Sequence, residues 1–231
     1  MDMELEQMLR PAELEMPEYP AKVITLATGG QMVVRAATRR EAPTIMKAVK
    51  PTIKIERDFY DVVGSRVYAE LLAWYKYRYR NCYVLVGQID NILVGVVNGR
   101  MLTDKIGISL HTLAIERGLR IGAHLFASKM EHHIEFLNQD EVWITAESPI
   151  GFRRWMIEYD LIKQLGVQHE LGGADSFMLT RDLYFKSKDR LVAGSRPCPE
   201  DLLEKAKSEI IIADEESIVT QICGMKGAWS K

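Results

Sequence analysis

The segment from residue 83 to residue 97 constrains the fold most, because two strongly apolar runs stand there on either side of a short polar turn. The runs are Tyr83–Gly87 and Ile92–Val97, both rich in valine, and Gln88–Asn91 lies between them. Apolar runs of this length around a turn that contains Asp90-Asn91 predict a β-hairpin. We therefore expect a sheet built around this hairpin.

Helices and further strands are predicted on both sides of the hairpin. Met32–Ala36 has the composition of a short strand, and Thr38 followed by Glu41 forms a capping box that starts a helix. Apolar residues keep helical spacing from Asp58 to Tyr79, which predicts a longer helix. The remaining predicted elements are strands at 108–115, 142–146, 166–170 and 176–180, and helices at 121–137, 151–161 and 201–208. This order predicts an α/β fold.

The composition places these elements in one folded domain with two appendages. The chain has 231 residues, of which 47% are hydrophobic and 27% are charged, as in ordinary globular proteins. We divide it into an arm and first strand at 1–30, an α/β domain at 31–185, and a linker with a helical tail at 186–231. We expect the domain at 31–185 to fold without the arm and the tail.

The charge balance excludes several classes of partner. Thirty basic and 32 acidic residues leave a formal net charge of −2, so no overall positive field attracts nucleic acid or an anionic membrane. No apolar run approaches the roughly 20 residues of a membrane helix, and the acidic start lacks the pattern of an export signal. The three cysteines, Cys82, Cys198 and Cys223, fit neither a disulfide framework nor a metal pair. We expect a cytoplasmic protein without a metal.

The segment Leu113–Leu125 carries the clearest chemical signal, because a strand meets a helix there through glycines and arginines. A helix start offers unpaired backbone N–H groups and the positive end of the helix dipole, and glycine lets an anion approach the backbone. The pattern predicts a phosphate-binding turn. The alternative is a tight turn in which glycine only permits close packing.

In this order of elements, the stretch from about Met32 to Leu183 resembles the GCN5-related N-acetyltransferase (GNAT) family. The family's turn has Arg or Gln, two residues, Gly, one residue, and then Gly or Ala. Arg117 matches the first position and Gly122 the last, whereas Arg120 stands where the first glycine is usual. The other matching features are Val34–Thr38 as the opening strand and cap, the hairpin Val84–Val97, and Leu113–Ile115 with Gly122-Ala123.

The resemblance implies a mixed, largely antiparallel sheet flanked by helices, the acyl-CoA N-acyltransferase-like class of α/β (α+β) fold. It implies transfer of acetyl from acetyl-CoA to a primary amine of a small molecule or peptide, with the fourth-strand backbone polarising the thioester. The residues that it assigns to the cofactor are Leu113, Ile115, Arg117, Gly118, Arg120, Ile121, Gly122 and Ala123.

Catalytic residues are inferred by position within this resemblance. The family has a tyrosine that protonates the departing thiolate, and Met156 falls on that position after Arg153-Arg154-Trp155. Tyr159 lies three residues later on nearly the same helical face, so we expect it to substitute, with a packed aromatic as the alternative. His111 on the fourth strand and Glu147 after the fifth are candidates for the base that takes the ammonium proton.

Some alternatives stay open at this stage. The departures at Arg120 and Met156 also suit a catalytically inactive GNAT-fold protein that binds or regulates, and transfer of another acyl or an aminoacyl group is a third interpretation. A homodimer formed through the arm is left open. His124, Ser128, Glu131 and Glu135 share one helical face, which we interpret as solvated, since no HExxH motif or Cys/His cluster accompanies it.

Overall fold

The computed structural model describes residues 3–9, 14–145, 156–165 and 175–224. These residues contain an eight-stranded sheet in the order β1-β2-β3-β4-β5-β6-β8-β7. Neighbouring strands run antiparallel except β5 and β6, which are parallel. The strands are β1 (Lys22–Thr25), β2 (Gln31–Ala36), β3 (Cys82–Ile89), β4 (Ile92–Met101), β5 (Ile106–Ala114), β6 (Glu141–Thr145), β7 (Ile162–Lys163) and β8 (Ser176–Thr180). The predicted mixed and largely antiparallel sheet is confirmed.

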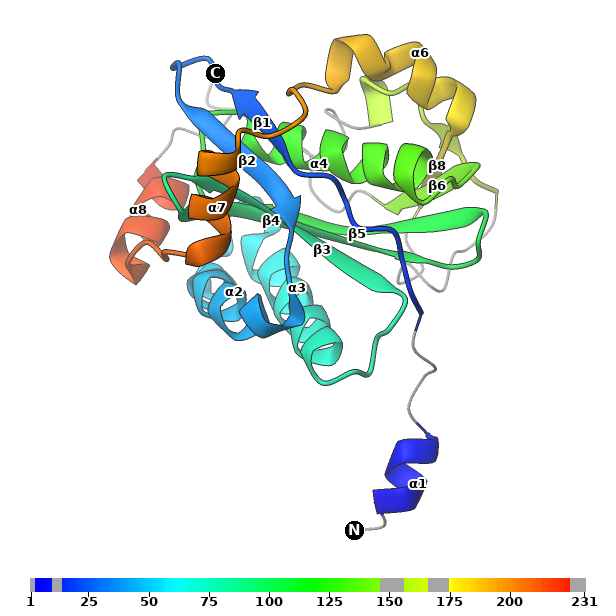
Figure 1. Ribbon diagram of the computed structural model, residues 1–231, viewed down its shortest axis with the longest axis horizontal. Helices are drawn as coiled ribbons and strands as arrows, with labels where there is room; N and C mark the ends of the chain where they lie inside the picture. The colour runs from blue at the N-terminus through cyan, green and yellow to red at the C-terminus, as the bar shows by residue number, and fades with distance from the viewer. Residues whose placement is uncertain (1–2, 10–13, 146–155, 166–174, 225–231) are drawn as a thin grey trace.

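Helices cover both faces of this sheet, with α2 and α3 on one side and α4 on the other (Figure 1). The helices are α1 (Met3–Met8), α2 (Ala42–Val49), α3 (Tyr60–Tyr75), α4 (Ile121–Glu131), α6 (Arg181–Leu191), α7 (Glu200–Ser208) and α8 (Glu215–Gly224). A π-helical turn, His132–Phe136, extends α4. The predicted helix at 121–137 is thus present in two parts.

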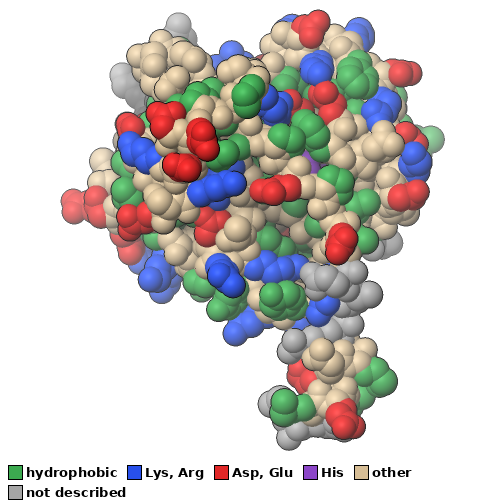
Figure 2. All heavy atoms as spheres, viewed as in Figure 1, with side chains coloured by type: hydrophobic (Ala, Val, Ile, Leu, Met, Phe, Trp, Pro, Cys, Tyr) green, Lys and Arg blue, Asp and Glu red, His purple; other side chains and the backbone are tan. Residues whose placement is uncertain are grey.

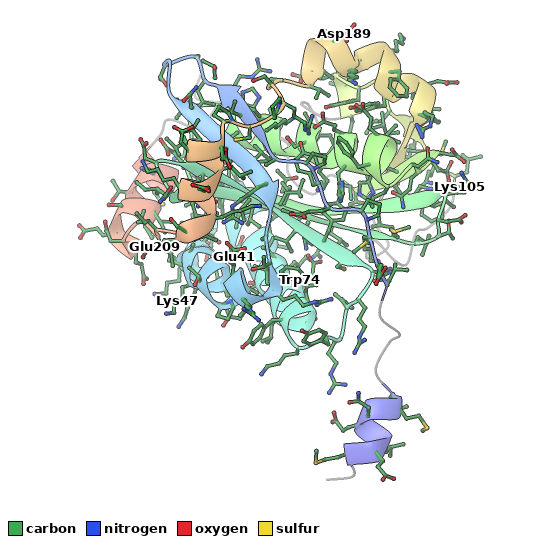
Figure 3. All side chains as sticks on the ribbon, viewed as in Figure 1. Glu41, Lys47, Trp74, Lys105, Asp189 and Glu209 are labelled. Carbon is green, nitrogen blue, oxygen red and sulfur yellow. The ribbon has the colours of Figure 1, made fainter. Side chains whose placement is uncertain are left out.

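The predicted helix start at Thr38 is present as a 3₁₀ turn, Arg39–Glu41, that leads into α2. The Glu41 carboxylate accepts the backbone N–H of Thr38 at 2.6 Å, and Figure 3 labels Glu41 at this position. The same carboxylate accepts a hydrogen bond from Arg35 of β2 at 2.6 Å. The cap therefore also fastens α2 to the sheet.

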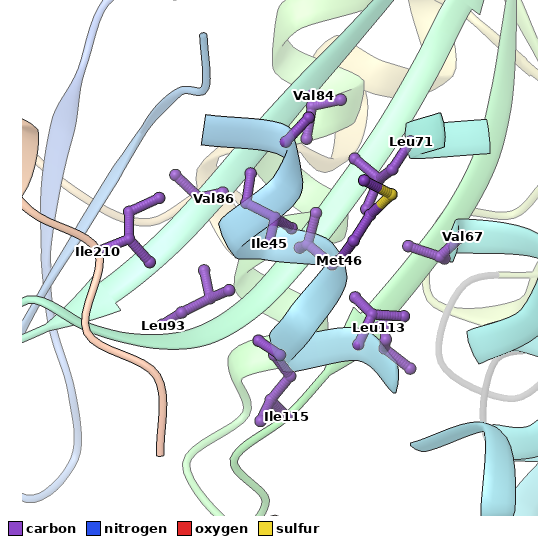
Figure 4. Close-up of a cluster of buried hydrophobic side chains, with 14 of the residues drawn as sticks. Ile45, Met46, Val67, Leu71, Val84, Val86, Leu93, Leu113, Ile115 and Ile210 are labelled. Carbon is purple, nitrogen blue, oxygen red and sulfur yellow. The ribbon is translucent and has the colours of Figure 1, made fainter. Parts of the chain in front are cut away.

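The larger core lies between α2, α3 and the middle of the sheet (Figure 4). Helical side chains at three- and four-residue spacing meet alternate strand residues there, as amphipathic elements require. Its labelled members are Ile45, Met46, Val67, Leu71, Val84, Val86, Leu93, Leu113, Ile115 and Ile210. Because Ile210 lies beyond α7, the tail contributes to the same core.

Helix α4 packs closely on the opposite face because β4 carries a glycine beneath it. A Cβ on Gly95 would lie 2.7 Å from Cδ1 of Leu125 and 3.0 Å from the Leu113 carbonyl oxygen, so a side chain there would push the helix away. The polar residues of α4 are also covered. Ser128, Lys129 and Glu131 are buried, which makes the predicted solvated face wrong. Three side chains cover it and contact Glu131, namely Tyr19 before β1, Lys22 at the start of β1 and Arg196 after α6.

A β-bulge in β5 changes the course of the sheet. The pairing with β4 moves from Val97–Thr112 to Gly99–Ser109, so one extra residue of β5 is accommodated opposite Asn98. The Asn98 side-chain oxygen accepts the backbone N–H of His111 at 3.0 Å. The pairing of β5 with β6 ends at Ser109, while β6 continues beside β8 to Thr145. The strands β5 and β6 are therefore paired up to the residue before the bulge, and β6 is described only as far as Thr145.

The arm and tail contact the sheet and its cores. Val23 and Ser195 exchange backbone hydrogen bonds of 3.2 and 2.9 Å, and Leu93 donates to Ile211 at 2.9 Å. Ile218 and Ile222 of α8, a helix that the sequence did not reveal, are buried in the larger core. The boundaries at 30 and 185 stay predictions, but these contacts argue that the appendages stabilise the domain.

Some expectations fall on residues outside the described ranges. These are Glu147, most of the helix at 151–161 and the strand at 166–170. In the described part of the chain, no helix combines the length and apolar character that a bilayer crossing needs. Acidic and basic side chains alternate over the face in Figure 2 without a large patch of one sign.

Candidate active site

The connection between β5 and α4 is held in a fixed shape by its backbone. The N–H groups of Ile115 and Glu116 both donate to the Val94 carbonyl, at 2.8 and 3.0 Å. Gly118 has φ +93°, and Arg120, the residue just before α4, has φ +60°. The left-handed backbone of Arg120 explains why the family pattern has glycine there, since a side chain in this region costs about 1–2 kcal/mol.

The start of α4 is open to an anion. The N–H groups of Ile121, Gly122 and Ala123 belong to the first turn, so they have no acceptor within the helix. No side chain of the described residues caps them. A Cβ on Gly122 would meet only the Ala114 Cβ, at 3.7 Å, so packing does not require glycine here. The missing side chain instead leaves room beside the positive end of the helix dipole.

A pocket of about 190 Å³ lies next to this helix start. Two arginines line it, Arg120 from the turn and Arg190 from α6, and His124 of α4 lines it as well. Its remaining lining residues are Ala123, Phe126, Glu158, Tyr159, Leu191 and Ala193. The Arg190 guanidinium also donates to the Glu158 backbone carbonyl at 2.6 Å. The two guanidinium groups make the pocket suitable for a phosphate.

Tyr159 forms the inner wall of this pocket. The side chain is only 2% exposed, and its ring packs edge-on against Phe126 with 5.6 Å between centroids. Its buried hydroxyl has no hydrogen-bond partner among the described residues. Burial, with a smaller effect of Glu158, raises the pKa of Tyr159, so the hydroxyl keeps its proton at neutral pH. It can therefore donate a hydrogen bond.

His111 belongs to a second polar group, at the bulge. Its Nε2 lies 3.1 Å from the Glu70 carboxylate of α3, and both side chains are largely buried. Asn98 donates its side-chain N–H to the other Glu70 oxygen while it accepts the backbone N–H of His111. Asn98 therefore fixes Glu70 and the bulge together. An imidazole that donates from Nε2 to Glu70 leaves Nδ1 as a proton acceptor.

The other predicted cofactor residues have different surroundings. The side chains of Leu113, Ile115 and Ile121 are buried in the hydrophobic cores, so only their backbone groups remain for a ligand. Arg117 forms an ion pair with Asp58 at 2.8 Å, which directs its guanidinium toward the start of α3. Gly118 is exposed in the turn.

The structure thus groups the candidates in two places. Arg120, Ala123 and Tyr159 share the pocket beside α4, and His111 lies with Glu70 at the bulge. Lys129 of α4 contacts the second group, because its Nζ donates to the His111 carbonyl at 3.0 Å. Glu147 lies outside the described residues.

Sequence reasoning missed Glu70, Asn98, Lys129 and Arg190. Lys129 had a local signal, since it follows the core residue Leu125 by four positions and so falls on the inner face of the helix. The other three meet the site only through long-range packing. Among the described residues, no group of three His, Cys, Asp or Glu side chains is arranged to hold a metal ion.

No protein-family model matches this sequence, and no curated protein sequence matches it either. Solved structures do. Apo FdhC, described as a nucleotide-linked sugar GNAT, matches with a TM-score of 0.52 and 11% identity, over 79% of this chain and 100% of that chain. An uncharacterized protein of Bacillus halodurans matches with a TM-score of 0.54 and 7% identity, over 74% and 96%. Mycobacterium smegmatis RimJ, solved with CoA-disulfide, has a TM-score of 0.48 and 11% identity over 78% and 100%. The likeness to the first two, together with the strand order, shows that this chain has the fold of the GCN5-related N-acetyltransferases.

Proposed function

We propose that this protein transfers an acetyl group from acetyl-CoA to a primary amine of a small molecule or a peptide. The observation that carries the proposal is the uncapped start of α4 beside a pocket lined by two arginines and by buried Tyr159, whose hydroxyl has no hydrogen-bond partner within the described ranges. The strand that leads into this helix, β5, carries the bulge and His111. The fold supports the same reaction class.

The residues around the pocket suit the phosphates of CoA. The first turn of α4 offers three backbone N–H groups and the space left by Gly122, and Arg120 and Arg190 supply positive charge to the pocket beside it. A guanidinium about 4 Å from a phosphate gains several kcal/mol at an effective dielectric constant of about 20. That gain is comparable to, or larger than, the backbone cost of Arg120. Acetyl-CoA would supply a thioester as the acyl donor.

Proton transfer would use the two groups already described. His111 takes the proton of the acceptor ammonium at Nδ1, and Glu70 stabilises the resulting imidazolium through Nε2. The Tyr159 hydroxyl holds a proton for the leaving group. Glu147 remains the alternative base. Positioning of the amine at the bulge would contribute most of the rate enhancement.

The first test is calorimetry of the full-length protein with acetyl-CoA, CoA and dephospho-CoA. We expect acetyl-CoA and CoA to bind with similar affinities, because the phosphates and not the acetyl group meet the arginines. The second test follows thiol release with a panel of amines and peptides. Absence of binding to both acetyl-CoA and CoA would refute the proposal.

A catalytically inactive binding protein is the second candidate, favoured by two specific observations. The Arg117 guanidinium is engaged by Asp58, and Met156 is buried in a hydrophobic cluster where the family pattern has its tyrosine. This candidate would be favoured over the enzyme if CoA binds but no amine of the panel is acylated, either with acetyl-CoA or with longer acyl donors.

A further inference from the structure

Arg190 is a cation of α6 that forms no ion pair with a carboxylate of the described residues. Lys186, on the same helix, is paired with Asp160 at 3.2 Å. The Arg190 guanidinium instead donates to the Glu158 backbone carbonyl at 2.6 Å and lines the pocket beside the start of α4. A guanidinium has five N–H donors, so this bond fixes the group and leaves donors for a ligand.

Arg120 supplies a second positive charge to the same pocket. Within the described part of the chain, its guanidinium also has no carboxylate partner. Arg117, which matches the family's motif, differs in this respect, because Asp58 neutralises it at 2.8 Å. Of the described residues that line the pocket, only Glu158 is acidic. Two guanidinium groups against one carboxylate give the pocket a net positive charge, so it suits an anion.

The start of α4 and the pocket are places for two separate anionic groups. At the helix start, the backbone N–H groups of the first turn and the space left by Gly122 suit a group that approaches the backbone. The pocket, of about 190 Å³, adjoins this turn through Ala123 and carries the guanidinium charges. At about 30 Å³ for each water of the liquid, it has room for a phosphate group and several waters.

CoA carries a diphosphate bridge and a 3′-phosphate on the same nucleotide. Each phosphorus of the bridge bears a single negative charge, whereas the 3′-phosphate is a monoester, which carries about −1.5 to −2 at pH 7. The more highly charged group fits the place with two guanidinium groups, and the diphosphate fits the helix start. We propose that the pocket binds the 3′-phosphate of CoA, and that Arg190 thereby makes the protein select CoA over dephospho-CoA. This inference rests on the proposed function.

Helix α6 is then part of the cofactor site. The family's motif does not include Arg190, which lies after the stretch 32–183 that carries the resemblance. Two contacts hold α6 against the segment before β7, one from Lys186 to Asp160 and one from Arg190 to the Glu158 carbonyl. The Arg190 side chain is itself exposed, so its replacement leaves the hydrophobic cores unchanged.

The test compares two ligands that differ only in the 3′-phosphate. Calorimetry of the full-length protein with CoA and dephospho-CoA is repeated for Arg190→Gln, whose amide can still donate to the Glu158 carbonyl. We expect the wild type to bind CoA at least tenfold more tightly than dephospho-CoA, and Arg190→Gln to bind the two within about threefold of each other. The affinity for dephospho-CoA should be nearly the same in both proteins, because that ligand lacks the group that Arg190 contacts.

Lys186→Gln is the matched control, since it removes a positive charge of α6 that does not line the pocket. This variant should keep the preference for CoA, and an equal loss of preference would overturn the inference, because the charge of α6 as a whole would then be responsible. Equal binding of both ligands by the wild type, or equal weakening of both by Arg190→Gln, would refute the role of Arg190 while the proposed function stands. Binding of neither ligand would refute the proposed function and this inference together.

Discussion

The Glu131 carboxylate and the Arg196 guanidinium form a two-point ion pair, with N–O distances of 2.7 and 2.9 Å, between residues 65 positions apart. Tyr19 and Lys22 donate to the same carboxylate, at 2.6 and 2.9 Å. Three hydrogen-bonding partners from the two ends of the chain are thus attached to one side chain of α4. This network fixes the helix whose start forms the proposed cofactor site.

Replacing Glu131 should destabilise the fold in a pH-dependent way. Despite its burial, hydrogen bonds and charges from Arg196 and Lys22 lower the pKa of Glu131 to about 2, from 4.5. Because the folded pKa lies below the unfolded one, the stabilisation is present above about pH 4.5 and is lost as the pH falls toward 2. We expect Glu131→Gln to lower the free energy of unfolding at pH 7 by about 3 kcal/mol. Denaturant titration measures this change in the free energy of unfolding.

The quantity to follow is the difference in the free energy of unfolding between the wild type and Glu131→Gln. Burial lowers the pKa of His132 to about 4 and that of His133 to about 3, so both proteins lose stability as the pH falls below about 6.5. The difference between the two proteins, which reports the Glu131 contribution, should disappear between pH 4.5 and 2. Glu215→Gln, which removes an exposed ion pair with Lys54, serves as the control and should change little. A constant difference at every pH would contradict the prediction.

Gly122→Val should weaken CoA binding at least tenfold, about 1.4 kcal/mol, because the side chain fills the space at the start of α4. The added Cβ makes only an ordinary contact with Ala114, so the variant should fold. Gly30→Val, in the turn between β1 and β2, is the matched control. An unchanged dissociation constant in folded Gly122→Val would exclude phosphate binding at this helix.

Tyr159→Phe should lower turnover by about 10²–10⁴ while the affinity for acetyl-CoA stays nearly constant. Its stability should not fall, because the buried hydroxyl has no partner to lose among the described residues. Turnover, calorimetry and thermal unfolding together measure these effects. Full activity in the variant would leave Tyr159 as a packed aromatic only.

The base is identified by pH profiles of three variants. A general base must be deprotonated to act, so the rate of the wild-type enzyme should rise with pH. If His111 is this base, His111→Ala should remove the rise, and Glu70→Gln should lower the rate because the imidazolium loses its carboxylate. If Glu147 has this role, Glu147→Gln should remove the rise instead. Full activity in all three would mean that catalysis depends on positioning alone.

The tail should contribute measurably to stability. Ile222 is completely buried in the larger core, so Ile222→Ala should cost about 2–5 kcal/mol. Ile211, which lies between α7 and α8, is 42% exposed. Ile211→Ala should therefore change the free energy of unfolding by no more than about 0.5 kcal/mol. For the same reason we expect a chain restricted to residues 31–185 to be much less stable than the full protein, contrary to the expectation from sequence. A cooperative near-ultraviolet melt of that fragment at the wild-type temperature would contradict this.

Local sequence patterns predict much of the fold. The valine-rich runs around Asp90-Asn91 predict the β3–β4 hairpin, and Thr38 with Glu41 predicts the helix start, because both signals act within a few residues. The glycines and Arg120 likewise mark the turn before α4. Their order along the chain predicts an α/β fold, whereas the mixed, largely antiparallel sheet with its flanking helices was implied by the resemblance to the GCN5-related N-acetyltransferases.

The surroundings of the charged side chains were decided by the tertiary structure. The face of α4 that carries Ser128 and Glu131 has the composition of a solvated surface, yet segments more than 60 residues away cover it. The Glu70–His111 pair and the buried amine of Lys129 arise in the same way, from elements that meet only in the folded protein. Local patterns specify backbone shape and which face is apolar. Whether a charge meets a partner, water or neither depends on long-range packing, which no local pattern contains.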